Sequence, residues 1–331
     1  MFNQEDGGVM SRLELERGVL SEISDIRSTY IRERAVFVDG TRMTEILLAL
    51  GAAKEDLENI KRVSDRLSSD PTLPFRRTRN GRFCLDFEDR RIYRMSAQPF
   101  VLSEEEDFVR HDSGVLRVFD EIEDDLQLNT AFQALLVFKA LVVDGISVEP
   151  RPRLDYDAGK WVCTVFSIRT VTVPELQGEP ALEGVHSDGV DHTMTTFLGC
   201  RNTTPDSAVT ILLDPAEKNG TRWDASDPSL RLAEHQHKAF LDTLLLVDHE
   251  RKHSVSPVYA MNEDEAATRD MAIFFTRRPA LEEHVSYPYD SLSQHTERPM
   301  SIGIPGGSYH GITPPDENVL FTSDEIFPEG Q

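Results

Sequence analysis

The pattern of apolar residues changes at Trp161, and this change limits the folds open to the chain. Short runs rich in β-branched and aromatic residues follow, separated by turn formers such as Asp-Gly, Pro-Asp and Asn-Gly. The runs lie at residues 162–173, 194–198, 208–213, 243–247, 254–259 and 271–276. Many short strands separated by such turns are typical of a β-sandwich. We therefore predict an all-β sandwich or jelly-roll core over residues 151–279.

The preceding residues, 1–150, favour helices. Apolar residues recur at helical spacing from about residue 10 to 34, and similar patterns cover residues 43–50, 55–67 and 129–143. A short β-like run lies at 35–38, and residues 75–114 have no clean period. After Pro279 the composition indicates an irregular tail. We predict one domain over 1–331, mainly β with flanking helices (α+β), made of a helical amino-terminal layer with a β extension (1–150), the core (151–279) and the tail (280–331).

The net charge of the chain restricts the classes of molecule that it can bind. The chain carries 58 Asp plus Glu against 35 Lys plus Arg, a formal charge of -23. A field of that sign repels nucleic acid and anionic membrane surfaces, so we expect neither partner. No apolar run is long enough to span a membrane, and the acidic start lacks a secretory pattern, so we expect a cytoplasmic protein. The composition predicts no oligomeric state.

One segment, Glu183 to Gly189, suggests a metal site. His186 and Asp188 are two residues apart, so on an extended strand end their side chains share a face. An Fe(II) oxygenase needs one further histidine and leaves positions open for co-substrate and oxygen. His253 begins a later β-like run and is our candidate, although His249 has the same strand parity. Spacing leaves this choice open.

An arginine on the next expected strand suggests the co-substrate. Arg269 precedes the run 270–276, and an arginine inside a β-sandwich is costly unless it holds an anion. The order HxD, distal His, Arg suits 2-oxoglutarate, whose keto-acid end binds iron while the arginine holds the far carboxylate. Ile273 and Phe275 share the parity of Arg269, so they are candidates for the substrate pocket. Their alternative role is ordinary core packing.

Several segments together resemble the 2-oxoglutarate–Fe(II) dioxygenases that act on free amino acids, such as isoleucine hydroxylases. They are, in order, residues 79–83 (RNGRF), 113–119 (SGVLRVF), the His186–Asp188 pair, 253–257 (HSVSP) and Arg269-Asp270. The resemblance implies a distorted double-stranded β-helix, that is, a jelly-roll or cupin-like core. It also implies iron held by His186, Asp188 and His253, and 2-oxoglutarate held by Arg269. It also implies O2 as oxidant and a small free aliphatic amino acid as substrate, with succinate and CO2 as co-products.

One departure from that family bears on the outcome. Members commonly carry a His-Gln pair before an arginine in the strand preceding the iron motif, where this chain reads Phe166-Ser167-Ile168-Arg169. The changed contacts point to another substrate or another outcome. Besides hydroxylation, some fungal relatives close the amine of valine onto carbon and form an aziridine. The sequence leaves hydroxylation and ring closure both open.

The remaining candidates each have a structural alternative. Arginines that could hold a substrate carboxylate, or form ion pairs with the many acids, are Arg79, Arg82, Arg117 and Arg169. Phe166 is a candidate pocket residue of open direction. We expect His192 at a strand end on the surface, and His235 and His237 in solvent. Two other functions remain: a metal-dependent hydrolase, which has no use for Arg269, and a catalytically silent jelly-roll binding protein.

Overall fold

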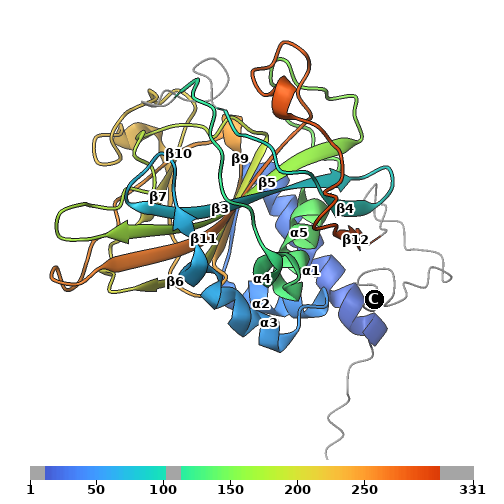
Figure 1. The fold of residues 1–331 in the computed structure, drawn as a ribbon, viewed down its shortest axis with the longest axis horizontal. Helices are drawn as coiled ribbons and strands as arrows, with labels where there is room; N and C mark the ends of the chain where they lie inside the picture. The colour runs from blue at the N-terminus through green and yellow to red at the C-terminus, as the bar shows by residue number, and fades with distance from the viewer. Residues whose placement is uncertain (1–11, 102–112, 306–331) are drawn as a thin grey trace, which may run out of the picture.

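The computed structural model describes residues 12–101 and 113–305 (Figure 1). Its largest feature is an antiparallel sheet with strand order β1-β9-β6-β11-β5-β3-β4-β12, and β2 pairs with β3 at its side. The bounds are β1 (Ala35–Val38), β2 (Ser68–Ser69), β3 (Arg76–Asp86), β4 (Arg91–Arg94), β5 (Lys160–Thr172), β6 (His192–Arg201), β9 (Thr243–Val247), β11 (Ala267–Arg277) and β12 (Ser301–Gly303). The long strands β5, β6 and β11 therefore lie in the middle of this sheet.

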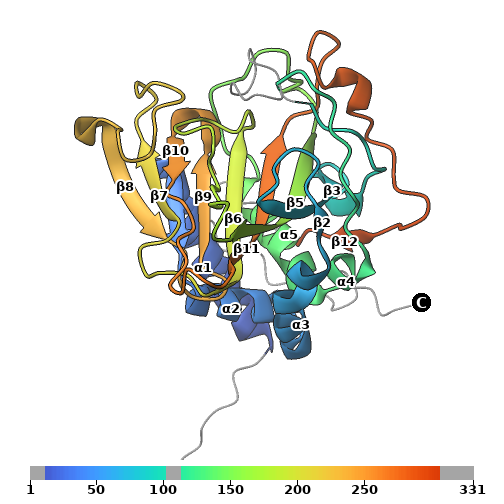
Figure 2. The ribbon, with the colours of Figure 1, turned by 60° about the vertical axis from the view of Figure 1, so that its left-hand side comes forward.

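A smaller sheet stands beside the large one (Figure 2). It has the order β10-β7-β8, with bounds β7 (Val209–Leu213), β8 (Arg231–Gln236) and β10 (Lys252–Val255). Residues from both sheets line one cavity: Thr210 and Val255 come from the small sheet, and Thr195 and Met271 from the large one. Two antiparallel sheets facing each other across a cavity give the predicted fold class, a mainly β, jelly-roll-like core.

Helices cover the other face of the large sheet (Figures 1 and 2). They are α1 (Arg12–Glu33), α2 (Gly40–Ala49), α3 (Lys54–Asn59), α4 (Asp124–Gln127) and α5 (Thr130–Val143), with short 3-10 turns η1 (Ile60–Arg66), η2 (Pro228–Leu230), η3 (Asp248–Glu250) and η4 (Tyr287–Tyr289). The side chain of Asn129 accepts the N–H of Phe132 and caps α5. Phe132 packs against Phe83 and Phe274 of the sheet, with ring centroids 5.5 and 6.0 Å away. Helix and sheet thus share one core.

The structure adds detail to the expected layout in one place and corrects it in another. Residues 75–114, which show no period, include β3 and β4, and β3 pairs with β5 along its whole length. From Asn80 to Phe83 every residue of β3 is buried, so inward and outward positions do not alternate. The tail 280–331 is not wholly irregular either, because β12 pairs with β4. Residues 306–331 lie outside the described part.

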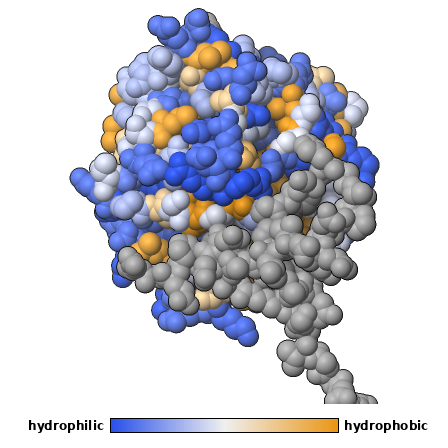
Figure 3. All heavy atoms as spheres, turned by 90° about the vertical axis from the view of Figure 1, so that its right-hand side faces the viewer, coloured by the Kyte–Doolittle hydropathy of each residue, from blue (hydrophilic) through white to orange (hydrophobic). Residues whose placement is uncertain are grey.

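The surface has a mixed character. On the face drawn in Figure 3, the coloured atoms show apolar residues in small separate patches among hydrophilic ones. Among the described residues, no helix is long and apolar enough to cross a membrane. Between the helices and the large sheet, apolar residues such as Phe132 and Phe274 are fully buried.

Candidate active site

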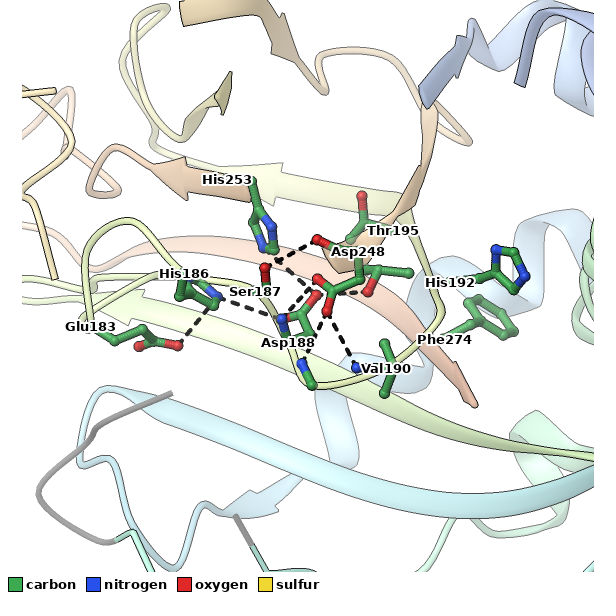
Figure 4. A network of polar contacts seen from close by, with 12 residues as sticks. Glu183, His186, Ser187, Asp188, Val190, His192, Thr195, Asp248, His253 and Phe274 are labelled. Atoms are coloured by element: carbon green, nitrogen blue, oxygen red, sulfur yellow. Dashed lines mark hydrogen bonds and ion pairs between the residues drawn. The ribbon is translucent and has the colours of Figure 1, made fainter. Parts of the chain in front are cut away.

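Three side chains converge from two parts of the sequence. His186, Asp188 and His253 each offer a potential ligand atom, and these atoms lie within 4.8 Å of one another. Nε2 of His186 lies 3.4 Å from Oδ1 of Asp188, and Nε2 of His253 lies 3.7 Å from Oδ2 (Figure 4). The backbones of the two histidines form a β-bridge with N···O distances of 3.0 Å. Two imidazoles and one carboxylate on one side of a metal are the donor set of Fe(II) oxygenases.

The charges around the triad set the protonation of its members. Burial lowers the pKa of His186, but the carboxylates of Glu183 and Asp188 outweigh it and raise the pKa to about 9. Burial opposes ionisation of Asp188, yet the two histidines lower its pKa to about 2. Burial lowers the pKa of His253 to about 4. Near neutral pH, Asp188 and His253 therefore have the forms that bind a metal, whereas His186 must release a proton first.

The backbone before His186 fixes the direction of its imidazole. Nδ1 of His186 lies 2.8 Å from the carbonyl oxygen of Gly184, so this N–H donates to the carbonyl and Nε2 faces Asp188. Gly184 has φ +77, and a Cβ there would lie 2.5 Å from the carbonyl oxygen of Thr221. Only glycine fits both the left-handed backbone and this close approach. Gly184 therefore allows the backbone conformation that brings His186 into the site.

A buried aspartate holds the loop that follows His186. Oδ1 of Asp248 accepts the N–H of Asp188 at 2.7 Å, and its Oδ2 accepts those of Gly189 and Val190 at 3.0 and 3.2 Å (Figure 4). Thr193 donates its hydroxyl to Oδ2 of Asp188 at 2.7 Å. These bonds fix both the backbone and the side chain of the carboxylate ligand. Asp248 has no obvious motif in the sequence, because its partners lie some 60 residues away.

Arg269 presents a buried cation to the same cavity. Its side chain is 7 % exposed, and it has no hydrogen bond or ion pair among the described residues. Burial lowers its pKa to about 10, so the guanidinium remains charged at neutral pH. A buried charge without a counter-ion is costly, and the guanidinium fork matches a carboxylate. The residue therefore fits the distal carboxylate of 2-oxoglutarate.

The cavity that joins these groups has a volume of about 150 Å³. Alternate residues of β11 line it, namely Arg269, Met271, Ile273 and Phe275. Phe166 and Ile168 of β5 line it too, and the Phe166 ring packs edge-on against Phe275 with ring centroids 5.7 Å apart. The structure thus places three sequence candidates, Phe166, Ile273 and Phe275, on the wall of the cavity that holds the triad.

The four candidate arginines have different surroundings in the structure. Arg117 is buried and lines the cavity. Arg79 instead pairs with Glu123 at 3.0 Å, and Arg169 pairs with Asp270 at 2.7 Å and Asp65 at 3.0 Å. Neither of these two lines the cavity, and the abundant acids of the chain explain why: each guanidinium meets a neighbouring carboxylate. For Arg79 and Arg169 the structure shows the ion-pair role.

Arg82 also has a carboxylate partner. It pairs with Asp290 and donates to the carbonyl of Tyr289, and Arg277 holds the same aspartate at 2.9 Å. Arg82, Arg277 and Tyr289 border a smaller cavity of about 30 Å³, which shares Asp188 and Phe275 with the main one. Arg82 therefore lies near the triad but is neutralised by Asp290 and does not line the main cavity.

The structure places the four remaining candidate histidines, and two of them differ from expectation. His192 is fully buried, with Nδ1 2.9 Å from the hydroxyl of Tyr30, so the surface assignment is wrong. His237, which directly follows β8, is also buried and lines the cavity, so the solvent assignment is wrong. Burial and then the charge of Arg269 lower its pKa to about 3, so this imidazole is neutral. His235 is partly exposed and stacks on Phe37. His249 lies in η3, outside the triad.

Comparison with known proteins agrees with this geometry. The family model described as 2OG-Fe dioxygenase matches residues 61–275. The chain belongs to this family. The chain is 49% identical to the solved Fe(II)/(alpha)ketoglutarate-dependent dioxygenase TqaL, with a TM-score of 0.77 over 88% of this chain and 97% of that one. IDO from Bacillus thuringiensis has a TM-score of 0.60 over 77% of this chain and 99% of that one; at 14% identity it shows the fold.

One relative with a similar sequence is a much longer protein than this chain. The chain is 44% identical over 285 residues to the bifunctional enzyme flvA of Aspergillus flavus, covering 86% of this chain and 35% of flvA. The chain thus spans about a third of the length of that relative. Membership of the dioxygenase family makes the chain an oxidoreductase that uses Fe(II), 2-oxoglutarate and O2. When bound, iron and 2-oxoglutarate supply the oxygen chemistry; His186, Asp188 and His253 fit the metal.

Proposed function

We propose that this dioxygenase oxidises a small free aliphatic amino acid of the valine or isoleucine type at an unactivated C–H bond. The observation that carries the proposal is one cavity of about 150 Å³ that contains the triad, an apolar wall and Arg269, which has no hydrogen bond or ion pair among the described residues. Arg269 fits the distal carboxylate of the co-substrate, so the apolar wall remains available for the substrate. A cavity of this size suits small molecules.

The walls support an aliphatic side chain. Phe166 lies among Phe100, Phe119 and Phe275, each packed edge-on against it at 5.2 to 5.7 Å between ring centroids. Ile273 packs against the same group. Apolar walls exclude water from the reacting carbon and select a hydrocarbon by shape.

The substrate carboxylate has one candidate partner among the four arginines considered. Arg117 lines the cavity, and its guanidinium carbon lies 5.9 Å from the Phe100 ring centroid, beside the aromatic group. A carboxylate held there places the aliphatic side chain of the same molecule against Phe166 and Phe275. We therefore assign Arg117 to the substrate carboxylate and the aromatic wall to the side chain.

Two outcomes suit this arrangement. Either the carbon that loses hydrogen gains a hydroxyl group, or the substrate amine closes onto that carbon and forms an aziridine; succinate and CO2 are released in both. The strand before the iron motif presents Phe166, Ile168 and Thr170 to the cavity, without the His-Gln pair of the family. The proposal therefore includes both outcomes, and the mass of the product distinguishes them.

The test is turnover of a panel of free amino acids. Protein loaded with Fe(II) and 2-oxoglutarate without oxygen is mixed with each amino acid, oxygen is admitted, and succinate and product mass are measured. We expect succinate to depend on valine or isoleucine. A product heavier by one oxygen atom indicates hydroxylation, and one lighter by two hydrogen atoms indicates ring closure. Succinate that no amino acid stimulates, from protein shown to hold iron, contradicts the proposal.

A further inference from the structure

The acidic residues that line the cavity indicate a further binding role. Among the described residues that line it, the carboxylates are those of Asp188 and Glu183. Asp188 belongs to the triad, so its charge is committed to the metal. Glu183 is left as the one acidic group of the described lining with no assigned role. Its side chain is 9 % exposed, so its charge is largely shielded from water.

Glu183 lies directly beside the metal-binding atoms. Its Oε1 is 3.5 Å from Nε2 of His186, the nitrogen that also faces Asp188 (Figure 4). The segment is held there by Gly184, which passes close to Thr221, and by the carbonyl of Gly184 on Nδ1 of His186. The backbone that orients the metal ligand therefore also fixes the position of the Glu183 side chain.

Glu183 has few polar partners. Apart from its contact with Nε2 of His186, it has no hydrogen bond or ion pair among the described residues. A carboxylate this deeply buried is costly unless it is paired. Since Glu183 also lines the cavity, a cationic group of a bound ligand can supply this pairing.

We propose that Glu183 binds the ammonium group of the substrate. This assignment rests on the proposed function, since an amino acid is the small molecule that brings both an ammonium group and a carboxylate. The cavity offers both complements, Glu183 and Arg117, beside an apolar wall. An ammonium group held by Glu183 lies next to the metal, which brings the nitrogen close to the carbon that is oxidised.

The assignment is tested by binding rather than turnover. Protein loaded with Fe(II) and 2-oxoglutarate under anaerobic conditions is titrated calorimetrically with L-valine and with 3-methylbutanoate, which has the same carbon skeleton without the amine. We expect the wild type to bind valine at least about tenfold more tightly than the analogue. In Glu183→Gln the Kd for valine should rise about 10- to 100-fold while that for the analogue stays unchanged.

Two further variants separate this role from a structural one. Glu183→Asp keeps the charge and should keep a preference for valine over the analogue. Glu217→Gln is the matched control: Glu217 is a glutamate whose side chain accepts the N–H groups of Asp227 and Lys218, and it does not line the cavity. It should leave both Kd values unchanged. Fe(II) affinity, measured in parallel, should not fall by more than about threefold in Glu183→Gln.

The outcomes that overturn the assignment are distinct. Equal valine binding by the wild type and Glu183→Gln rejects Glu183 as the ammonium site and leaves the proposed function standing. Loss of Fe(II) affinity in Glu183→Gln identifies Glu183 as a metal ligand instead. If the wild type binds no amino acid of the panel, the proposed function and this assignment are both rejected.

Discussion

The two faces of β11 have different functions. On one face Arg269, Met271, Ile273 and Phe275 line the cavity. On the other, Ala272 and Phe274 are fully buried in the core that the helices cover. Arginines follow the same division: Arg269 faces the cavity without a hydrogen bond or ion pair in the described structure, whereas Arg169 of the adjacent strand pairs with Asp270. One face stabilises the fold, and the other holds groups whose partners are ligands.

Neighbouring phenylalanines give the largest expected contrast. Phe274→Ala should lower the free energy of unfolding by about 3–5 kcal/mol, because it removes a fully buried ring from the core. Phe275→Ala should cost less stability, because this side chain is partly exposed to the cavity, and should change the amino acid preference. Urea unfolding and succinate formation with valine measure the two effects. Equal losses of stability would remove the distinction between the faces.

The two arginines should differ in their effect on 2-oxoglutarate. Arg269→Met should raise the KM for 2-oxoglutarate about 100- to 1000-fold, since it removes a buried partner of a carboxylate. Arg169→Met is the control: it breaks the pair with Asp270 on the other face and should lower Tm while changing this KM less than about threefold. A KM that rises as much in Arg169→Met as in Arg269→Met would show that the effect is not specific to the cavity.

The charges at the triad predict how metal binding depends on pH. The pKa of His186 is raised to about 9, so below that pH the imidazole must lose a proton before it binds a metal. The apparent affinity for Fe(II) should therefore rise about tenfold per pH unit up to pH 9 and then level off. Anaerobic titrations at several pH values measure it. In Glu183→Gln, which removes one source of the shift, the levelling should move to lower pH.

The smallest expected effect concerns His237. Its imidazole is neutral, and its Nε2 lies 3.1 Å from the hydroxyl of Thr195, so its contribution to an anion near Arg269 is that of an uncharged hydrogen bond. His237→Ala should raise the KM for 2-oxoglutarate about fivefold. His235→Ala, at a partly exposed residue near the end of β8, is the control and should leave it unchanged. An increase in both variants would point to a general loosening of β8.

Local patterns in the sequence determined much of the fold. The apolar surface of α5 and the short β-rich runs after Trp161 predict helix and strands, because periodicity depends on neighbours along the chain. The two-residue spacing of His186 and Asp188 places both on one side for the same reason. The shared parity of Arg269, Ile273 and Phe275 likewise predicts that they face one way. The structure differs where both faces of a strand are buried, as in β3, because alternation then disappears.

Only the tertiary structure decided which distant groups meet. His249 and His253 have the same parity, and the β-bridge between residues 186 and 253 selects His253. The arginine candidates look alike in sequence, yet Asp270 and Asp290 neutralise two of them. The burial of His237 and the support of the metal loop by Asp248 also depend on contacts between segments far apart in the chain. Such contacts are set by strand register and packing, which no local pattern encodes.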